Sequence, residues 1–183
     1  MRVIAGNLKG RRLLCPSGTT VRPTADATKE TIFNLLGARL PGSIALDVFA
    51  GIGALGIEAL SRGARRVDFI ERDGSALKYL CKNLERIGIG EEAGVLKGDA
   101  FTWIRKLHAK GRTYGVAFVD PPYGMGMVAR FLSCEEAHPV LGEGGTLVVQ
   151  HHAKEQVERH PSRYAIESQR TFGDTIVTLL VSR

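Results

Sequence analysis

The sequence predicts an α/β protein whose doubly wound, mostly parallel sheet ends in an antiparallel C-terminal hairpin. Between residues 44 and 150, short apolar runs of strand length alternate with segments of helical period. Such alternation favours a parallel sheet that is covered by helices on both faces. A glycine-rich loop follows the first run, which is where such sheets bind ligands. Near the C-terminus, two extended runs are joined only by residues 171–174, which are too few to hold a crossover helix.

The first 23 residues predict a basic β-hairpin extension, ahead of a main domain over residues 24–183. Apolar pairs at residues 3–4 and 13–14 flank a turn-like stretch at residues 7–10. Positive charge gathers here, at Arg2, Lys9, Arg11 and Arg12. These side chains can contact a nucleic acid, and the alternative is a solvated basic edge that discourages aggregation.

The first helix is expected just after Pro23. This proline biases Arg22 toward an extended conformation, and Thr24 or Asp26 can cap the first turn. Further strands are predicted at residues 44–50, 67–71, 95–97, 116–119, 145–150, 164–170 and 175–181. Helices are predicted through residue 60, over 77–87, over 101–110 and within 126–138.

Composition excludes several classes of protein. The chain has 183 residues, 44% of them hydrophobic and 24% charged, which indicates one folded domain. Its net charge of +6 is compatible with a polyanionic partner but does not prove one. Three cysteines without CxxC spacing fit neither a disulfide scaffold nor a zinc ribbon. No membrane span, signal peptide or bound metal is expected, and the predicted location is the cytoplasm.

The glycine loop matches G-x-G-x-x-G at Gly51, Gly53 and Gly56, between a predicted strand and a predicted helix. Glycines let a ligand approach the backbone and let the helix pack closely on the strand. Glu71 follows Gly51 by 20 residues and ends the next strand, where a carboxylate can accept hydrogen bonds from ribose hydroxyls. This pattern fits any adenosine-binding fold of this type.

Two aspartates narrow the choice of ligand. Asp47, just before the glycine loop, would repel a diphosphate and attract a ligand with an ammonium and a sulfonium, such as S-adenosylmethionine. The alternative is a carboxylate that braces the loop or caps the helix. Asp99, after the third strand, can accept from an adenine amino group or cap the helix that begins near Phe101.

The tetrapeptide Asp120-Pro121-Pro122-Tyr123 follows the fourth strand. The prolines stiffen the loop, so that it loses little entropy on binding. The Asp120 carboxylate and the Pro121 carbonyl can accept both hydrogens of a planar exocyclic amine, and Tyr123 can stack on an extruded base. If the first and fourth strands flank the switch point of the sheet, this loop faces the glycine loop.

The motifs DVFAGIGALG, IERD, GDA and DPPY resemble the Rossmann-like, class I S-adenosylmethionine-dependent methyltransferases that act on exocyclic amines. The segments RVIAGNLKGRRL, VRPTADATKETIFNLL, EALSRGA and FGDT resemble the RsmD family, bacterial 16S rRNA (guanine N2)-methyltransferases. The resemblance covers nearly the whole chain. The sequence departs from the family pattern at Lys29, where arginine is usual, and at Ile52, where serine is common.

The resemblance implies that S-adenosylmethionine is the cofactor and that it contacts Asp47, Phe49, Gly51, Gly53, Glu71, Arg72, Asp99 and Ala100. It places the target guanine at Asp120, Pro121, Pro122 and Tyr123. Substrate RNA is expected at Arg22 and Thr24, as well as at Arg2, Lys9, Arg11 and Arg12. The expected partner is 16S rRNA, in the small ribosomal subunit or an assembly intermediate, and the protein is expected to act as a monomer.

The predicted reaction is in-line attack of a guanine N2 amine on the methyl group of S-adenosylmethionine. Because the same tetrapeptide can hold any planar amine, an adenine-N6 methyltransferase acting on DNA or RNA is the alternative. Asp47 and the tetrapeptide oppose an NAD-binding oxidoreductase. A donor site and an acceptor site in one chain oppose a non-catalytic RNA-binding module.

Overall fold

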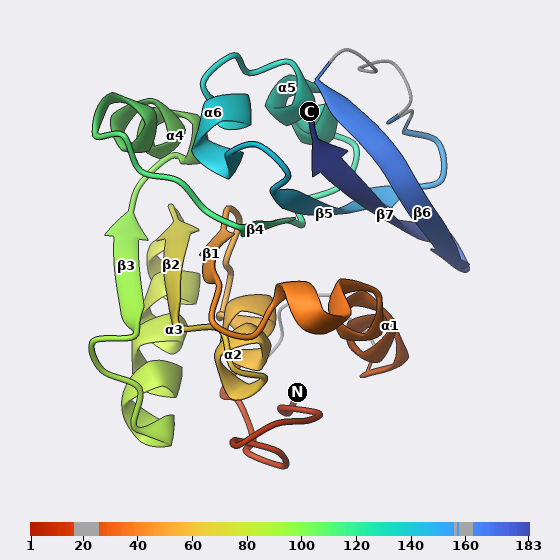
Figure 1. Cartoon of the computed structure of the whole chain (residues 1–183). Coiled ribbons are helices and arrows are strands. Elements are labelled where there is room, and N and C mark those ends of the chain that lie inside the picture. The colour runs from red at the N-terminus through yellow and green to blue at the C-terminus, as the bar shows by residue number, and fades with distance from the viewer. Residues whose placement is uncertain (17–25, 156, 158–162) are drawn as a thin grey trace.

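The computed structural model describes residues 1–16, 26–155, 157 and 163–183. In this part of the chain, seven strands form one sheet in the order β3-β2-β1-β4-β5-β7-β6 (Figure 1). The strands are β1 (Ile44–Asp47), β2 (Arg66–Glu71), β3 (Ala93–Lys97), β4 (Val116–Val119), β5 (Thr146–His152), β6 (Tyr164–Phe172) and β7 (Thr175–Ser182). The helices are α1 (Asp26–Leu36), η1 (Gly37–Arg39), α2 (Ala54–Ser61), α3 (Gly74–Ile87), α4 (Ala100–Ala109), α5 (Met127–Leu132) and α6 (Ala137–Leu141).

The sheet topology confirms the predicted fold class. β1 pairs in parallel with both β2 and β4, so the order of the strands reverses between β1 and β4. β2 and β3, and β4 and β5, are also parallel neighbours. β7 runs antiparallel to both β5 and β6, and only Gly173 and Asp174 separate β6 from β7. A crevice is therefore expected where the loops after β1 and β4 diverge.

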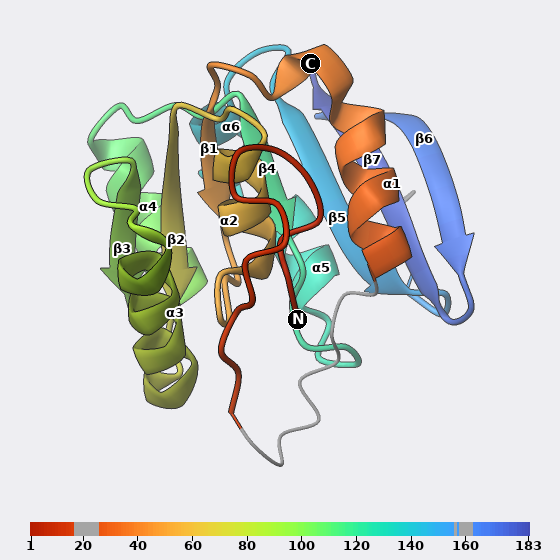
Figure 2. The same ribbon diagram turned by 90° about the horizontal axis from the view of Figure 1, so that it is seen from below.

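Two helical layers cover the sheet, with α1, α2 and α3 on one face and α4, α5 and α6 on the other (Figure 2). The sequence of β4 is apolar at every position, because both of its faces are buried. Val116 and Phe118 pack in the core under the first layer, whereas Ala117 and Val119 pack in the core under the second. A strand that is buried on both faces needs apolar side chains at every position.

Some predicted boundaries are wrong. β1 ends at Asp47, because the chain forms a turn at residues 48 and 49. The single helix predicted within residues 126–138 is two short helices, α5 and α6, separated by residues 133–136. At the N-terminus, the predicted hairpin has just one antiparallel bridge, Arg2–Arg12, in the described residues. A turn at residues 6–11 does reverse the chain there, with Gly10 N donating to Val3 O at 2.9 Å.

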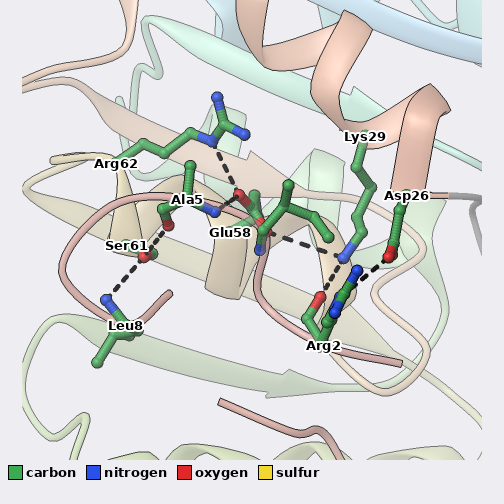
Figure 3. A network of polar contacts seen from close by, with 9 residues as sticks. Arg2, Ala5, Leu8, Asp26, Lys29, Glu58, Ser61 and Arg62 are labelled. Carbon is green, nitrogen blue, oxygen red and sulfur yellow. Dashed lines mark hydrogen bonds and ion pairs between the residues drawn. The ribbon is translucent and has the colours of Figure 1, made fainter. Parts of the chain in front are cut away.

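Residues 1–16, here called the N-terminal arm, are fastened to the main core. Val3 and Leu13 are buried and belong to the same hydrophobic cluster as the core residues of α1, α2 and α3. The side chain of Asn83 on α3 holds Leu14 through bonds to both its amide and its carbonyl, of 2.7 and 3.0 Å. Ser61 Oγ on α2 accepts from Leu8 N at 3.0 Å (Figure 3). The arm is thus a layer over α2 and α3.

A buried ion pair lies beneath the arm (Figure 3). Glu58 on α2 and Lys29 on α1 have fully buried side chains, and their charged atoms are 3.8 Å apart. The Glu58 carboxylate also accepts from Ile4 N, Ala5 N and Arg62 Nε at 2.8–3.0 Å. Lys29 Nζ donates to the carbonyl of Arg2. Burial lowers the pKa of Lys29, and the negative charges of Glu58 and Asp26 oppose that shift.

The close packing of α2 on β2 depends on the absence of a side chain at Gly56. A Cβ at this position would lie 2.2 Å from Phe69 Cε1 and 2.9 Å from Val67 Cγ1, both in the core. We therefore expect Gly56→Ala to lower the free energy of unfolding by about 1–3 kcal/mol, as overpacked cores do. Urea denaturation measures this effect, with Gly74→Ala as a control in open space. Equal midpoints for Gly56→Ala and the wild type would contradict the packing argument.

Among the described residues, no helix combines the length and apolarity needed to span a membrane.

Candidate functional site

A cavity of about 690 Å³ opens where the strand order reverses, at the carboxyl ends of the parallel strands. It brings together most residues of the two predicted sites. Those that line it are Phe49, Gly51, Glu71, Arg72, Asp99, Ala100, Asp120, Pro121, Pro122 and Tyr123. Residues far apart in the sequence thus share one cavity, as the β1–β4 switch point predicts. Asp47 and Gly53 do not line it.

Glu71 lines the cavity and is held by two backbone amides. Its carboxylate accepts from Gly51 N and from Asp73 N, each at 2.6 Å. Gly51 has φ 55°, and a Cβ there would meet nothing within 4 Å, so this turn of the glycine loop presents bare backbone. Each carboxylate oxygen has a second lone pair, so Glu71 can accept further bonds from a ligand.

Asp47 differs from the sequence-based expectation of a direct cofactor contact. Its side chain is 2% exposed, and Oδ2 accepts from Gly56 N at 2.9 Å near the start of α2. This is the alternative role, a carboxylate that braces the loop and the helix. Gly53 is likewise structural, with φ 88° at the N-cap of α2. Its missing Cβ would lie 2.5 Å from Leu80 Cδ1.

Carboxyl groups gather at the cavity wall and, at Asp47, just behind it. Burial raises the pKa of Asp47 to about 7 against the opposing hydrogen bond from Gly56, and the charges of Asp120 and Glu71 raise it further. Three carboxylates therefore interact around the glycine loop and the tetrapeptide. Such a region favours a cationic ligand over a diphosphate.

This raised pKa predicts a pH-dependent stability. Between the ordinary value of 3.8 and about 7, native Asp47 keeps a proton that the unfolded chain has released. The free energy of unfolding should therefore fall as the pH rises through that window. Asp47→Asn cannot ionise, and its amide oxygen can still accept from Gly56 N. We expect this variant to gain stability over the wild type from pH ~4 to pH ~7 and to hold that gain above. Urea denaturation at a series of pH values measures the free energy of unfolding of both proteins. If this free energy changes with pH in the same way in Asp47→Asn and in the wild type, the prediction is contradicted.

Asp99 lines the cavity and also caps a helix. It is the N-cap residue of α4, and its Oδ1 accepts from Thr102 N at 3.0 Å and Thr102 Oγ1 at 3.2 Å. The capping role that the sequence left open is therefore present. Because both bonds end on Oδ1, the cap and a contact through Oδ2 are compatible.

The tetrapeptide also lines the cavity. Pro121 is buried, whereas Asp120 and Tyr123 are half-buried. Tyr123 is oriented by its surroundings, since its hydroxyl donates to Thr175 Oγ1 at 3.2 Å and its ring meets His152 edge-on at 6.1 Å. The ring is thus fixed against the end of the C-terminal hairpin.

Several lining residues were not predicted from the sequence: Met1, Thr28, Met125, Met127, Gln150, Phe172 and Thr175. Met1 comes from the N-terminal arm, and Thr28 from the first turns of α1. Phe172 and Thr175 flank the β6–β7 turn. No local motif marks them, because the tertiary fold alone brings the arm and the hairpin to the cavity.

The basic residues of the arm lie outside the cavity. Lys9, Arg11 and Arg12 are exposed. Arg2 is also exposed, and its Nε donates to Asp26 Oδ2 at 3.1 Å. Arg22 and Thr24, which were predicted to contact RNA, lie outside the described residues. Lys29 is not among the cavity residues, because its ammonium is buried against Glu58.

A sheet of this order with a cavity at its switch point is the architecture of Rossmann-like methyltransferases. The chain belongs to the RsmD family, since residues 1–181 match the family model described as Conserved hypothetical protein 95. The YlbH protein of Bacillus subtilis (strain 168) is 36% identical, with all of both chains covered. Ribosomal RNA small subunit methyltransferase D of Escherichia coli (strain K12) is 31% identical, covering 98% of this chain and 88% of the relative.

Solved structures agree with this assignment. A hypothetical protein of Thermus thermophilus is 30% identical, with a TM-score of 0.83 and 98% of both chains covered. SMU.776, solved in complex with SAH, has a TM-score of 0.69 but is only 12% identical. That likeness covers 85% of this chain and 48% of SMU.776, and it shows the shared fold alone.

Proposed function

We propose that the protein transfers a methyl group from S-adenosylmethionine to the exocyclic N2 amine of a guanine in 16S rRNA. The observation that carries this proposal is the convergence of two loops on one cavity. The glycine loop with Glu71 offers a place for the methyl donor, and the tetrapeptide offers acceptors for an amine. The family relatives include small subunit rRNA methyltransferases, which supports rRNA as the substrate.

The residues around the glycine loop fit S-adenosylmethionine. Glu71, fixed by two backbone amides, can accept from the ribose hydroxyls, and the open backbone at Gly51 permits close approach. Asp99 and Ala100 can receive the adenine, and Phe49 and Arg72 line the same cavity. The carboxylate charge that raises the pKa of Asp47 would attract the ligand's cationic groups. When bound, S-adenosylmethionine supplies an activated methyl group.

The tetrapeptide would hold the acceptor. The Asp120 carboxylate and the Pro121 carbonyl accept the two hydrogens of the N2 amine, which aims its lone pair at the donor site. Asp120 also stabilises the positive charge that develops on nitrogen. Tyr123, held by Thr175, stacks on the extruded base. Alignment of the two reactants should provide much of the rate enhancement.

The exposed basic arm is proposed to contact the RNA backbone. Lys9, Arg11 and Arg12 lie outside the core on the same arm that brings Met1 to the cavity. Phosphate contacts of this kind position the RNA without reading its sequence. We further propose that the chain acts as a monomer on 16S rRNA within the small subunit or an assembly intermediate, which would supply the rest of the recognition. The target expected from the resemblance is guanine 966.

The direct test is transfer of radiolabelled methyl groups to small subunits from a strain that lacks this protein. We expect label on N2-methylguanosine at a single nucleotide after digestion and mapping. Label on N6-methyladenosine would instead favour the alternative, an adenine-N6 methyltransferase. Absence of transfer to free rRNA, assembly intermediates and finished subunits alike would refute both.

A further inference from the structure

We propose that Gln150 reads the ring edge beside the target amine and thereby selects guanine. The proposal rests on the function proposed above. Gln150 lines the cavity but is only 3% exposed. Among the described residues, none bonds to its Nε2, which is buried. The next residue on β5 differs, because His151 Nε2 bonds to Thr178 Oγ1 at 2.9 Å and Nδ1 to the His152 carbonyl at 3.1 Å.

The sheet places Gln150 beside Asp120. β4 and β5 are parallel, with Val119 in register with Val149. Both valines pack in the core under α4–α6, so the following residues, Asp120 and Gln150, begin on the opposite side of the sheet. Neighbouring strands lie about 4.8 Å apart. The amide therefore stands one strand away from the carboxylate that is proposed to hold the amine, and both line the same cavity.

The chemistry of an amide matches guanine. On the Watson–Crick edge, the N2 amine is followed by the N1–H donor and then by the O6 acceptor. The Gln150 side chain has one acceptor and one donor group, and rotation about its last torsion can present both to this pair. In adenine the amine is flanked by two ring acceptors, N1 and N7, so the amide could make only one hydrogen bond there, through its NH2 group, and its oxygen would face no donor. A bound guanine would also give the buried Nε2 the partner that it lacks.

Two RNA substrates that differ only in the target base measure what this contact contributes. One RNA carries guanosine at the target, and the other carries 2-aminopurine ribonucleoside, which keeps the amine but lacks the N1–H and O6 pair. We expect the wild type to favour guanosine in kcat/KM by roughly 10- to 100-fold, as bidentate base contacts do. In Gln150→Leu this preference should fall to within about threefold of unity, with the loss confined to guanosine. Because the preference is a ratio, it does not depend on the fraction of active protein.

Gln169→Leu is the matched control, because it removes an amide from an exposed position on β6 that does not line the cavity. It should keep the wild-type preference. If Gln150→Leu does not fold, Gln150→Met, with an unbranched chain of the same length, is judged by the same ratio. A wild-type ratio in a folded Gln150 variant would overturn the inference and leave the proposed function standing. A wild type that methylates no guanosine N2 would overturn both.

Discussion

Replacing Asp120 by alanine is expected to slow methyl transfer by about ten- to several-hundredfold, the effect of losing one charge-assisted hydrogen bond to the reacting amine. The carboxylate lines the cavity at the end of β4, where the tetrapeptide begins. Single-turnover transfer to small subunits, with enzyme in excess, measures the chemical step separately from product release.

Controls separate this effect from damage to the fold. Loss of Asp120 removes one of the charges that raise the pKa of Asp47. Urea denaturation of the variant checks that the fold is intact. Glu143→Ala removes an exposed carboxylate at the opposite end of β5 and should leave transfer unchanged. Binding of S-adenosylhomocysteine should persist in both variants. Near-normal turnover by Asp120→Ala would refute the role assigned to this residue.

Replacing Glu58 by leucine is expected to lower the free energy of unfolding by about 3–5 kcal/mol, the range for removing one partner of a buried ion pair. The substitution leaves the fully buried Lys29 ammonium without its counterion. It also takes the acceptor from Ile4 N and Ala5 N, which fasten the N-terminal arm. Because whole domains are stable by only about 5–15 kcal/mol, chemical denaturation resolves such a loss easily.

Three further variants test the explanation: Arg2→Ala, Lys29→Met, and the double variant at Glu58 and Lys29. Arg2→Ala breaks an ion pair whose side chains are 64% and 47% exposed, so the cost should stay below about 1 kcal/mol. The double variant Glu58→Leu with Lys29→Met removes both buried charges and should be more stable than Glu58→Leu alone. If the double variant instead shows the sum of the two single losses, the coupling between the charges is absent.

The sequence predicted the sheet and both loops because their signals are local. Strand runs, the glycine spacing and the tetrapeptide each lie within a few adjacent residues, and the rules of doubly wound sheets then bring them together. The direction of a buried carboxylate is not a local property. Asp47 could not be assigned to Gly56 N from spacing, because the bond spans a loop and the start of a helix.

Two features of the sequence are consistent with the buried ion pair, although no prediction was drawn from them. Lys29 stands on the same helical stripe as Ile32, Phe33 and Leu36, a face that the structure buries. Glu58 is the sole charged residue of α2, whose other residues are apolar or small. Charges in such positions are buried and paired more often than solvated. Gln150 carried no comparable signal, since its missing partner is visible only in three dimensions.

We propose that the donor and acceptor loops form one site, and a crystal structure with sinefungin can decide this claim. We expect the ligand's ribose hydroxyls to contact Glu71 and the amine that replaces the transferable methyl group to lie toward Asp120, with Tyr123 beside it. An empty cavity at saturating ligand, or a ligand bound away from both loops, would contradict this claim.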